Sequence, residues 1–320
     1  MEKYDVLCVG FAVQDIVMQG IPREALERDS TCAKKTLVAA GGDAVNQAAV
    51  LAKLGRRTAL IANFGRDPVG VQIAADMEAN GVDITHAVRD GVEKTSFSVV
   101  VIRDDGQRSF LVGTGKGDNI DLSPEQMPFE LLGQTRAVSI GSLFFLKKLD
   151  GAGAASIFKA AKAKGVLTFA DMTADAYGIG PEGVAEIYPY TDYIMPSYEE
   201  AVYAAREEDP DAIADYFLER GVGTCVIKMG SRGCFVKNRS QRFMSEAFAV
   251  KAVDTTGCGD AFCGAFISAV LDGMGLEECV RYASAAGAIN ATVLGAHTAV
   301  KSNSQVRGFM EEALKNTEER

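Results

Sequence analysis

The sequence predicts an α/β protein with a mostly parallel sheet, helices on both faces of it, and a small additional antiparallel sheet. Short apolar runs alternate with helix-period segments along most of the 320 residues, which is typical of parallel strands joined by crossover helices. Two stretches, at about 12–38 and 94–114, contain strand patterns with no helix between them, which indicates an inserted antiparallel sheet. We expect a single domain spanning residues 1–320.

The individual elements follow from apolar periodicity and from stop signals. Buried strands are expected at 6–10, 58–65, 137–145, 166–172, 192–197 and 224–230. Helices are expected at 44–55, 69–81, 153–165, 211–221, about 259–273 and 277–291, and the charged tail suggests a fraying helix end. Within the insertion, "VVVIRDDGQRSFLV" predicts a hairpin around Asp104-Asp105-Gly106.

Composition excludes several classes of function. Lys and Arg total 33 against 43 Asp and Glu, a net charge of −10, which disfavours nucleic-acid binding. The N-terminal "MEKYDVLCVG" predicts a strand and no signal peptide, and no apolar run is long enough for a membrane span. The seven cysteines form no C-x-x-C pair, so we expect a reducing, cytoplasmic setting. With only His86 and His297, we expect no histidine-rich metal site; the count allows a Ser-His-Asp triad, but neither histidine lies in a recognisable setting for one.

The stretch "DTTGCGDAF" (254–262) suggests a site for anion chemistry. Gly257 and Gly259 allow a tight turn and close approach of a ligand, and a helix begins at once, so its free N–H groups and dipole favour an anion. Asp260 in the first turn is placed to take a proton from an attacking hydroxyl. Taken alone, the stretch is equally compatible with a capping acid beside a plain turn. No P-loop motif is present, and "GIGPEG" contains Pro181 and does not directly follow a strand, so an NAD-dependent oxidoreductase is discarded.

A second group of polar residues lies near the N-terminus, in and before "AAGGDAVNQAAVLAKLG" (39–55). Gly41 and Gly42 permit close backbone approach, and Asn46 offers an amide suited to a sugar hydroxyl. Asp15, after the first strand, can accept from two neighbouring hydroxyls. Each residue alone also fits a structural role as a turn glycine, a capping Asn or a solvated Asp.

Together, Gly-Gly-x-x-x-Asn near the N-terminus and Asp-Thr-Thr-Gly-x-Gly-Asp-x-Phe near the C-terminus resemble the two signatures of the PfkB, or ribokinase-like, carbohydrate kinase family. The resemblance covers essentially the whole chain. It implies a ribokinase-like three-layer core with a β lid, and transfer of the γ-phosphoryl group of ATP to a hydroxyl of a sugar or sugar-like molecule.

The resemblance also implies roles for particular residues. Asp260 matches the catalytic base, and the backbone N–H groups of the preceding turn match the anion hole. Lys228, otherwise a strand-end surface charge, lies in "KMGSRG" and matches the nucleotide-side strand end. The implied anion hole is Gly257, Cys258 and Gly259; the acceptor site is Asp15, Gly41, Gly42 and Asn46; the ATP site is Lys228, Gly230, Gly233 and, near the adenine, Ser284.

Cation sites are implied in the same way. The family's Asn-x-x-Glu motif organises Mg²⁺ through water, and in "PSYEEA" Glu200 keeps the acid while Ser197 replaces Asn. Mg²⁺ needs only one or two carboxylates beside water and phosphates. Some members bind a monovalent cation such as K⁺, for which Asp254 and Thr256, with the segment around Gly295, match the two loops. Asp254 equally fits an Asx turn.

For the acceptor, we expect a small free sugar that is ribose- or ketose-like. Asp43 and Val45 replace the commoner Lys or Gly and Ala of ribokinase-type patterns. Lid side chains set specificity in such enzymes, and those predicted to do so here are Phe97, Val99, Val101 and Phe110, with Arg103, Arg108 and Lys116 either solvated or forming a phosphate fork. Two alternatives stay open: a nucleoside kinase of the same fold, and a non-catalytic sugar-binding regulator, against which the intact Asp260 argues. If the lid strands pair between subunits, the protein is a homodimer.

Overall fold

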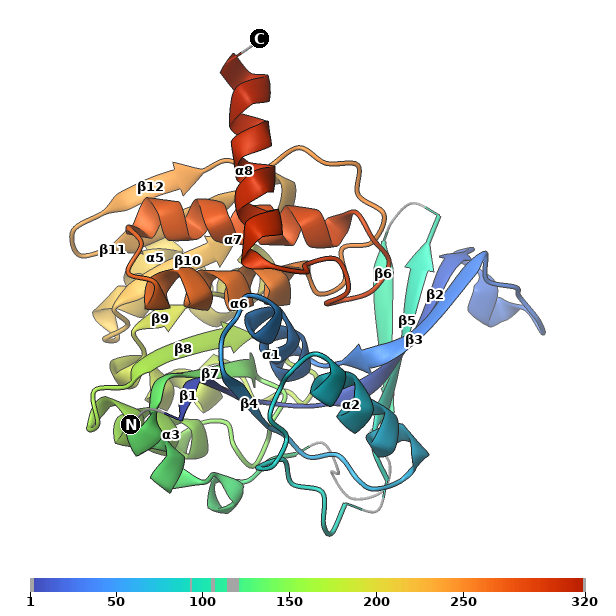
Figure 1. Cartoon of the computed structure of the whole chain (residues 1–320), viewed down its shortest axis with the longest axis horizontal. Helices are drawn as coiled ribbons and strands as arrows, with labels where there is room; N and C mark the ends of the chain where they lie inside the picture. The colour runs from blue at the N-terminus through green and yellow to red at the C-terminus, as the bar shows by residue number, and fades with distance from the viewer. Residues whose placement is uncertain (1–2, 93, 105–106, 114–120, 319–320) are drawn as a thin grey trace.

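The computed structural model describes residues 3–92, 94–104, 107–113 and 121–318, and it contains two sheets (Figure 1). The larger sheet has the strand order β12-β11-β10-β9-β8-β7-β1-β4. The six strands from β10 to β4 are parallel, whereas β11 and β12 add an antiparallel edge that the sequence pattern did not predict. The strands are β1 (Tyr4–Val9), β4 (Thr58–Ile61), β7 (Thr135–Leu143), β8 (Leu167–Met172), β9 (Tyr193–Ile194), β10 (Thr224–Lys228), β11 (Cys234–Asn238) and β12 (Arg242–Ser245).

Helices cover both faces of this sheet and form a three-layer core (Figure 1). Alternate residues of β1 point to opposite layers: Val6 and Cys8 join one apolar cluster, and Leu7 and Val9 join the other. The first layer contains α1 (Asp43–Lys53), α2 (Pro68–Ala79), α6 (Cys258–Leu271) and α7 (Leu276–Ala291), and the second contains α3 (Ala152–Lys162), α4 (Tyr198–Ala205) and α5 (Pro210–Glu219). Helix α8 (Asn303–Glu318) packs on α7 and extends away from the body.

Shorter 3-10 segments connect these elements. They are Ala25–Glu27, Pro124–Gln126, Phe129–Gln134, Pro181–Tyr190 and Gly230–Arg232. Within the part of the chain that is described, no helix is both long and apolar enough to cross a membrane.

The inserted strands form the expected second sheet, in the order β3-β2-β5-β6. Strands β2 and β3 form one antiparallel hairpin, and β5 and β6 form another. The two hairpins lie side by side, and their neighbouring strands β2 and β5 are parallel. The strands are β2 (Val13–Ile21), β3 (Lys35–Gly41), β5 (Phe97–Arg103) and β6 (Arg108–Gly113). Asp105 and Gly106 of the predicted turn, and Lys116, lie outside the described residues.

The two faces of the second sheet differ in burial. One face packs Val17, Val100 and Ile102 against Leu294 from the loop after α7. The other leaves large apolar side chains exposed: Val38 by 50%, Phe97 by 46% and Leu111 by 48%. A solvent-exposed apolar sheet face of this kind usually marks a surface that binds a ligand or another protein.

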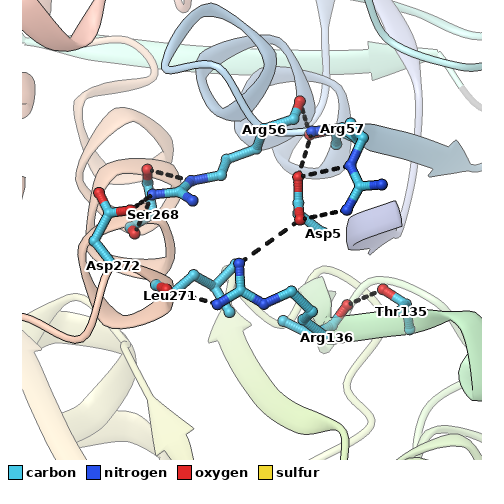
Figure 2. A network of polar contacts seen from close by, with 10 residues as sticks. Asp5, Arg56, Arg57, Thr135, Arg136, Ser268, Leu271 and Asp272 are labelled. Atoms are coloured by element: carbon cyan, nitrogen blue, oxygen red, sulfur yellow. Dashed lines mark hydrogen bonds and ion pairs between the residues drawn. The ribbon is translucent and has the colours of Figure 1, made fainter. Parts of the chain in front are cut away.

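Helix α6 is fixed at its C-terminal end by a network of arginines (Figure 2). Arg56 donates to the Ser268 carbonyl at 2.9 Å and pairs with Asp272 at 2.5 Å. Arg136 donates to the Leu271 carbonyl at 2.6 Å. Cations near these last carbonyls add hydrogen bonds to them and complement the helix dipole. The network therefore holds the position of the helix whose first turn carries Asp260.

Candidate active site

The turn before α6 has a conformation that only glycine tolerates. Gly257 is the N-cap residue with φ of 69°, and a Cβ there would lie 2.2 Å from the Ala296 carbonyl oxygen. Asn290 of α7 secures the turn by donating to the Thr256 carbonyl at 2.9 Å. The Cys258 N–H donates to the Thr255 carbonyl at 3.2 Å, so this predicted anion-hole donor is already engaged within the turn.

Asp260 lies in the first turn of α6 and is 8% exposed. Its Oδ2 accepts a hydrogen bond from Asn46 Nδ2 at 2.8 Å. Burial, followed by the charge of Asp171, raises the pKa of Asp260 to about 6, although Asn46 and Lys228 partly offset the rise. A carboxylate with a pKa near neutrality is suited to accept a proton at physiological pH.

The residues predicted for the acceptor side lie together at the start of α1. Gly42 is the N-cap residue with φ of 99°, and a Cβ on it would lie 2.4 Å from the Phe11 carbonyl oxygen. A Cβ on Gly41 would lie 2.0 Å from Asp15 Oδ2, so the carboxyl group rests directly against this glycine. Burial raises the pKa of Asp15 to about 7. The fold thus brings Asp15, Gly41 and Gly42 together, and Asn46 follows one turn later.

Lys228 is partly buried at the end of β10, with a side chain that is 13% exposed. Its Nζ is 2.8 Å from both carboxylate oxygens of Asp171, a buried residue of β8. Cys263 lies against the same pair, 3.2 Å from Asp171 Oδ2. A Cβ on Gly259 would be 3.3 Å from Lys228 Nζ. Lys228 therefore sits beside the α6 turn as half of a buried ion pair and is not a surface charge.

Glu200 and Ser197 form a capping box at the start of α4. The Ser197 N–H donates to Glu200 Oε2 at 2.7 Å, and the Glu200 N–H donates to Ser197 Oγ at 3.3 Å. Burial, followed by the charge of Asp171, raises the pKa of Glu200 to about 7. The described residues contain no group of three or more metal-binding side chains. A single carboxylate fits Mg²⁺ held mainly by water and phosphates.

Asp254 joins two loops beneath the turn. Its Oδ1 accepts from the N–H and the hydroxyl of Thr256 at 2.9 and 2.7 Å, which is an Asx-type turn. Its Oδ2 accepts from the Gly295 N–H at 3.0 Å. The two segments predicted to flank a monovalent cation are therefore held together by this buried carboxylate.

The remaining residues predicted for the nucleotide side lie after β10 and in α7. Gly230 and Gly233 lie in and just after the 3-10 turn between β10 and β11, with φ of 58° and 89°. Ser284 lies in α7, three residues before Gly287, where a Cβ would come within 3.3 Å of the Cys258 carbonyl oxygen. Residues three apart share a helix face, so Ser284 is on the side of α7 that faces the turn.

Several polar residues of the site were not predicted from the sequence. Asp43 has a buried oxygen, Oδ2, without a hydrogen-bond partner among the described residues. Burial and then the charge of Asp260 raise the pKa of Asp43 well above its usual range. Asp171 and His297 were also missed. Two features of the sequence pointed to these residues. Asp43 departs from the ribokinase-type pattern, and His297 follows Gly295 by two residues.

Comparisons with known proteins identify relatives that span nearly the whole chain. Residues 4–303 match the sequence profile described as pfkB family carbohydrate kinase. Ribokinase of Haemophilus influenzae is 28% identical over 283 residues, covering 86% of this chain and 89% of that protein. A probable fructokinase of Arabidopsis thaliana, fructokinase-5, is 27% identical over 292 residues, covering 87% and 90%.

The fold comparison gives the same result. The structure of Arabidopsis thaliana ribokinase complexed with ribose and ATP matches with a TM-score of 0.79 at 26% identity, covering 97% of this chain and 99% of that one. The predicted ribokinase-like fold is thereby confirmed. Because the family profile also spans nearly the whole chain, the protein belongs to the PfkB family of carbohydrate kinases and is a phosphotransferase.

Proposed function

We propose that this protein transfers the γ-phosphoryl group of ATP to a hydroxyl of a small free sugar, ribose- or ketose-like, with Asp260 as the general base. The observation that carries the proposal is the buried carboxylate of Asp260 in the first turn of α6, with a pKa of about 6. A base beside a helix N-terminus is the arrangement that phosphoryl transfer requires. The relatives named ribokinase and fructokinase support the choice of acceptor.

In the proposed step, the acceptor hydroxyl oxygen forms a bond to the γ-phosphorus and the bond to the oxygen bridging the β-phosphorus breaks. The hydroxyl proton passes to Asp260, and ADP leaves. The Gly257–Gly259 turn and the N-terminal end of the α6 dipole stabilise charge on the transferred group. Lys228, Gly230, Gly233 and Ser284 are proposed to line the ATP side, and Asp15, Gly41, Gly42 and Asn46 the acceptor side.

We propose two cations with different roles. Mg²⁺, bound with ATP and oriented through water by Glu200, would neutralise phosphate charge. The loops tied by Asp254 and Thr256 to Gly295 are proposed to bind K⁺ and so rigidify the turn. Comparing ADP release in K⁺ with that in a large organic cation tests this second role, and equal rates would refute it.

The charge of the site supports a neutral acceptor. Asp15, Asp43 and Asp260 are carboxyl groups at or near the acceptor side, and the nearby Lys228 is already paired with Asp171. An anionic acceptor would be repelled by ionised Asp260 and by the ionised fraction of Asp15, and it would find no free cation in Lys228, so it would lose affinity. We therefore expect free sugars to be phosphorylated in preference to sugar phosphates and sugar acids.

The lid sheet is the proposed dimer interface. Its exposed face carries Val38, Phe97 and Leu111, and covering them with a second copy would remove apolar surface from water. Light scattering at micromolar concentration should give twice the chain mass, and a monomer would refute the assignment. All seven cysteines are free thiols, which supports the proposal of a reducing, cytoplasmic location.

The test of the proposed function is ADP release over a panel of free pentoses and ketohexoses, sugar phosphates, sugar acids and nucleosides. We expect turnover with a free sugar, abolished by omitting Mg²⁺. Turnover confined to nucleosides would establish the alternative nucleoside kinase. Sugar binding by calorimetry without any turnover would establish a non-catalytic sugar-binding protein.

A further inference from the structure

A continuous hydrogen-bonded chain runs from Asp260 to the protein surface. Asn46 Nδ2 donates to Asp260 Oδ2 at 2.8 Å, and Asn46 Oδ1 lies 2.9 Å from His297 Nδ1. On the far side of the ring, His297 Nε2 lies 3.0 Å from Asp76 Oδ2. Asp260, Asn46 and His297 are buried, whereas the side chain of Asp76 is 36% exposed.

The chain determines where its protons lie. Ionised Asp260 only accepts hydrogen bonds, so the NH₂ group of Asn46 must face it and the amide oxygen must face His297. An amide oxygen also only accepts, so His297 Nδ1 carries a hydrogen.

The second ring nitrogen is fixed by Asp76. Burial raises the pKa of Asp76, but the hydrogen bond and charge of His297 outweigh that effect and the net pKa is lowered, so Asp76 is ionised at neutral pH. Its carboxylate lies 3.0 Å from Nε2 and holds that side of the ring.

We propose that His297, held by Asp76, is a positioning residue that locks the Asn46 amide with its NH₂ group toward the base. The proposal rests on the proposed function of Asp260. If the imidazole ring turned its unprotonated Nδ1 toward Asn46, two acceptors would face each other and the amide would be driven to flip. A flipped amide presents its oxygen to the Asp260 carboxylate, which destabilises the ionised base.

The surroundings of His297 fix it firmly enough for this role. Lys53 of α1 donates to the His297 carbonyl at 2.5 Å. The neighbouring residue, Ala296, is in close contact with the α-carbon of Gly257, so one segment supports both the anion turn and Asn46. The charged groups around the ring are Asp76 from α2 and Lys53 from α1, with Lys301 near Lys53 and Asp260 beyond Asn46.

Two substitutions separate positioning from packing. In His297→Asn, the amide nitrogen takes the place of Nδ1 and still donates to Asn46. In His297→Gln, the amide takes the place of Nε2, nearer Asp76, and the donor to Asn46 is lost. We expect His297→Gln to lower kcat about tenfold, the value of one lost hydrogen bond to a key group, and to move the acidic limb of the pH profile to higher pH. His297→Asn should restore most of kcat and the original limb.

The control is the other histidine. His86 lies at the edge of the Tyr4 ring, outside the chain just described, and His86→Gln should leave kcat and the pH profile unchanged. Equal loss in His297→Asn and His297→Gln, or a loss without any change in the pH profile, would indicate packing alone and overturn the proposal.

A second measurement does not depend on activity. With ¹⁵N-labelled histidine the protein gives signals from only two rings, and His86→Gln assigns them. We expect Nδ1 of His297 to carry a hydrogen, as its contact with the Asn46 amide oxygen requires. An Nδ1 without a hydrogen in the unsubstituted protein would refute the proposal. If no acceptor is phosphorylated, the proposed function fails. The histidine spectrum then still tests whether His297 donates a hydrogen bond to Asn46.

Discussion

The replacement Asp260→Asn should reduce catalysis while making the protein more stable. Asn keeps the shape of the side chain and its acceptor oxygen for Asn46, but it cannot take a proton. General-base catalysis contributes about 10² to 10⁴ in rate, so kcat should fall by two to four decades with little change in ATP affinity. In the parent protein, kcat/KM should rise with pH through about 6, where Asp260 ionises, and Asp260→Asn should lack this limb.

Although Asp260→Asn should lower the rate, it should raise the free energy of unfolding, and the size of this gain follows from the pKa of Asp260. The pKa of Asp260 is raised from 3.8 to about 6, so the folded state binds a proton more tightly than the unfolded chain does between these values. Stability therefore falls as pH rises through that window. At 1.36 kcal/mol per pKa unit, the difference costs about 3 kcal/mol at neutral pH.

Asp260→Asn removes that cost, and we expect about 1–3 kcal/mol of added stability at pH 7, lost below pH 4. Urea unfolding at the two pH values, with ADP release at saturating acceptor, measures both effects. Near-normal turnover would refute the base assignment. Unchanged or lower stability at pH 7 would refute the claim that ionised Asp260 is electrostatically strained.

Three further substitutions test other parts of the site. Lys228→Met leaves Asp171 charged, buried and unpaired, so unfolding in urea should show a loss of about 3–5 kcal/mol, part of which a second change, Asp171→Asn, should restore. Asn46→Ala should raise the KM of the acceptor and also lower kcat, since Asn46 contacts the base; an effect confined to the KM of ATP would contradict its placement. Arg56→Met removes hydrogen bonds from the last turn of α6 and should cost about 1–2 kcal/mol with KM unchanged; a thermal melt with no shift would contradict the anchoring role of the arginine network.

The sequence predicted most of the core because its signals are local. Apolar runs and small-residue helices sit within a few residues of their predicted bounds, as for α6, expected at about 259–273 and observed at Cys258–Leu271. The antiparallel edge formed by β11 and β12 was missed because each strand is short and partly exposed. Its pairing with β10 is a tertiary property that periodicity does not encode.

The same distinction applies to the site. Asp260 and its glycines could be predicted because a helix N-terminus and its turn are adjacent in sequence. Asp171 could not, because its pairing with Lys228 depends on β8 and β10 ending at the same edge of the sheet, with β9 between them. Open α/β sheets gather functional residues at these carboxyl ends. The contact of His297 with Asn46 spans 251 positions and has no local signal.

The distance between Asn46 and Asp260 depends on close packing of α1 and α6, which gives a last prediction. At Gly264, one turn beyond Asp260, a Cβ would lie 3.1 Å from Val50 Cγ1 and 3.2 Å from the Gln47 carbonyl oxygen. Gly264→Ala must therefore push the two helices apart by a few tenths of an ångström, at a cost of about 1–3 kcal/mol. Better helix propensity offsets about 1 kcal/mol of this.

The control is Gly308→Ala in α8, where a Cβ meets only open space; it should gain about 0.5–1 kcal/mol and leave kinetics unchanged. Gly264→Ala should lower kcat several-fold and raise the apparent pKa of the acidic limb, because a longer hydrogen bond from Asn46 stabilises the ionised base less. If stability is nearly unchanged but the acidic limb of the pH profile shifts, the packing of α1 against α6 at Gly264 acts on the ionisation of Asp260. An unshifted limb at reduced stability would show that helix packing and base ionisation are independent, which would refute the argument that links them.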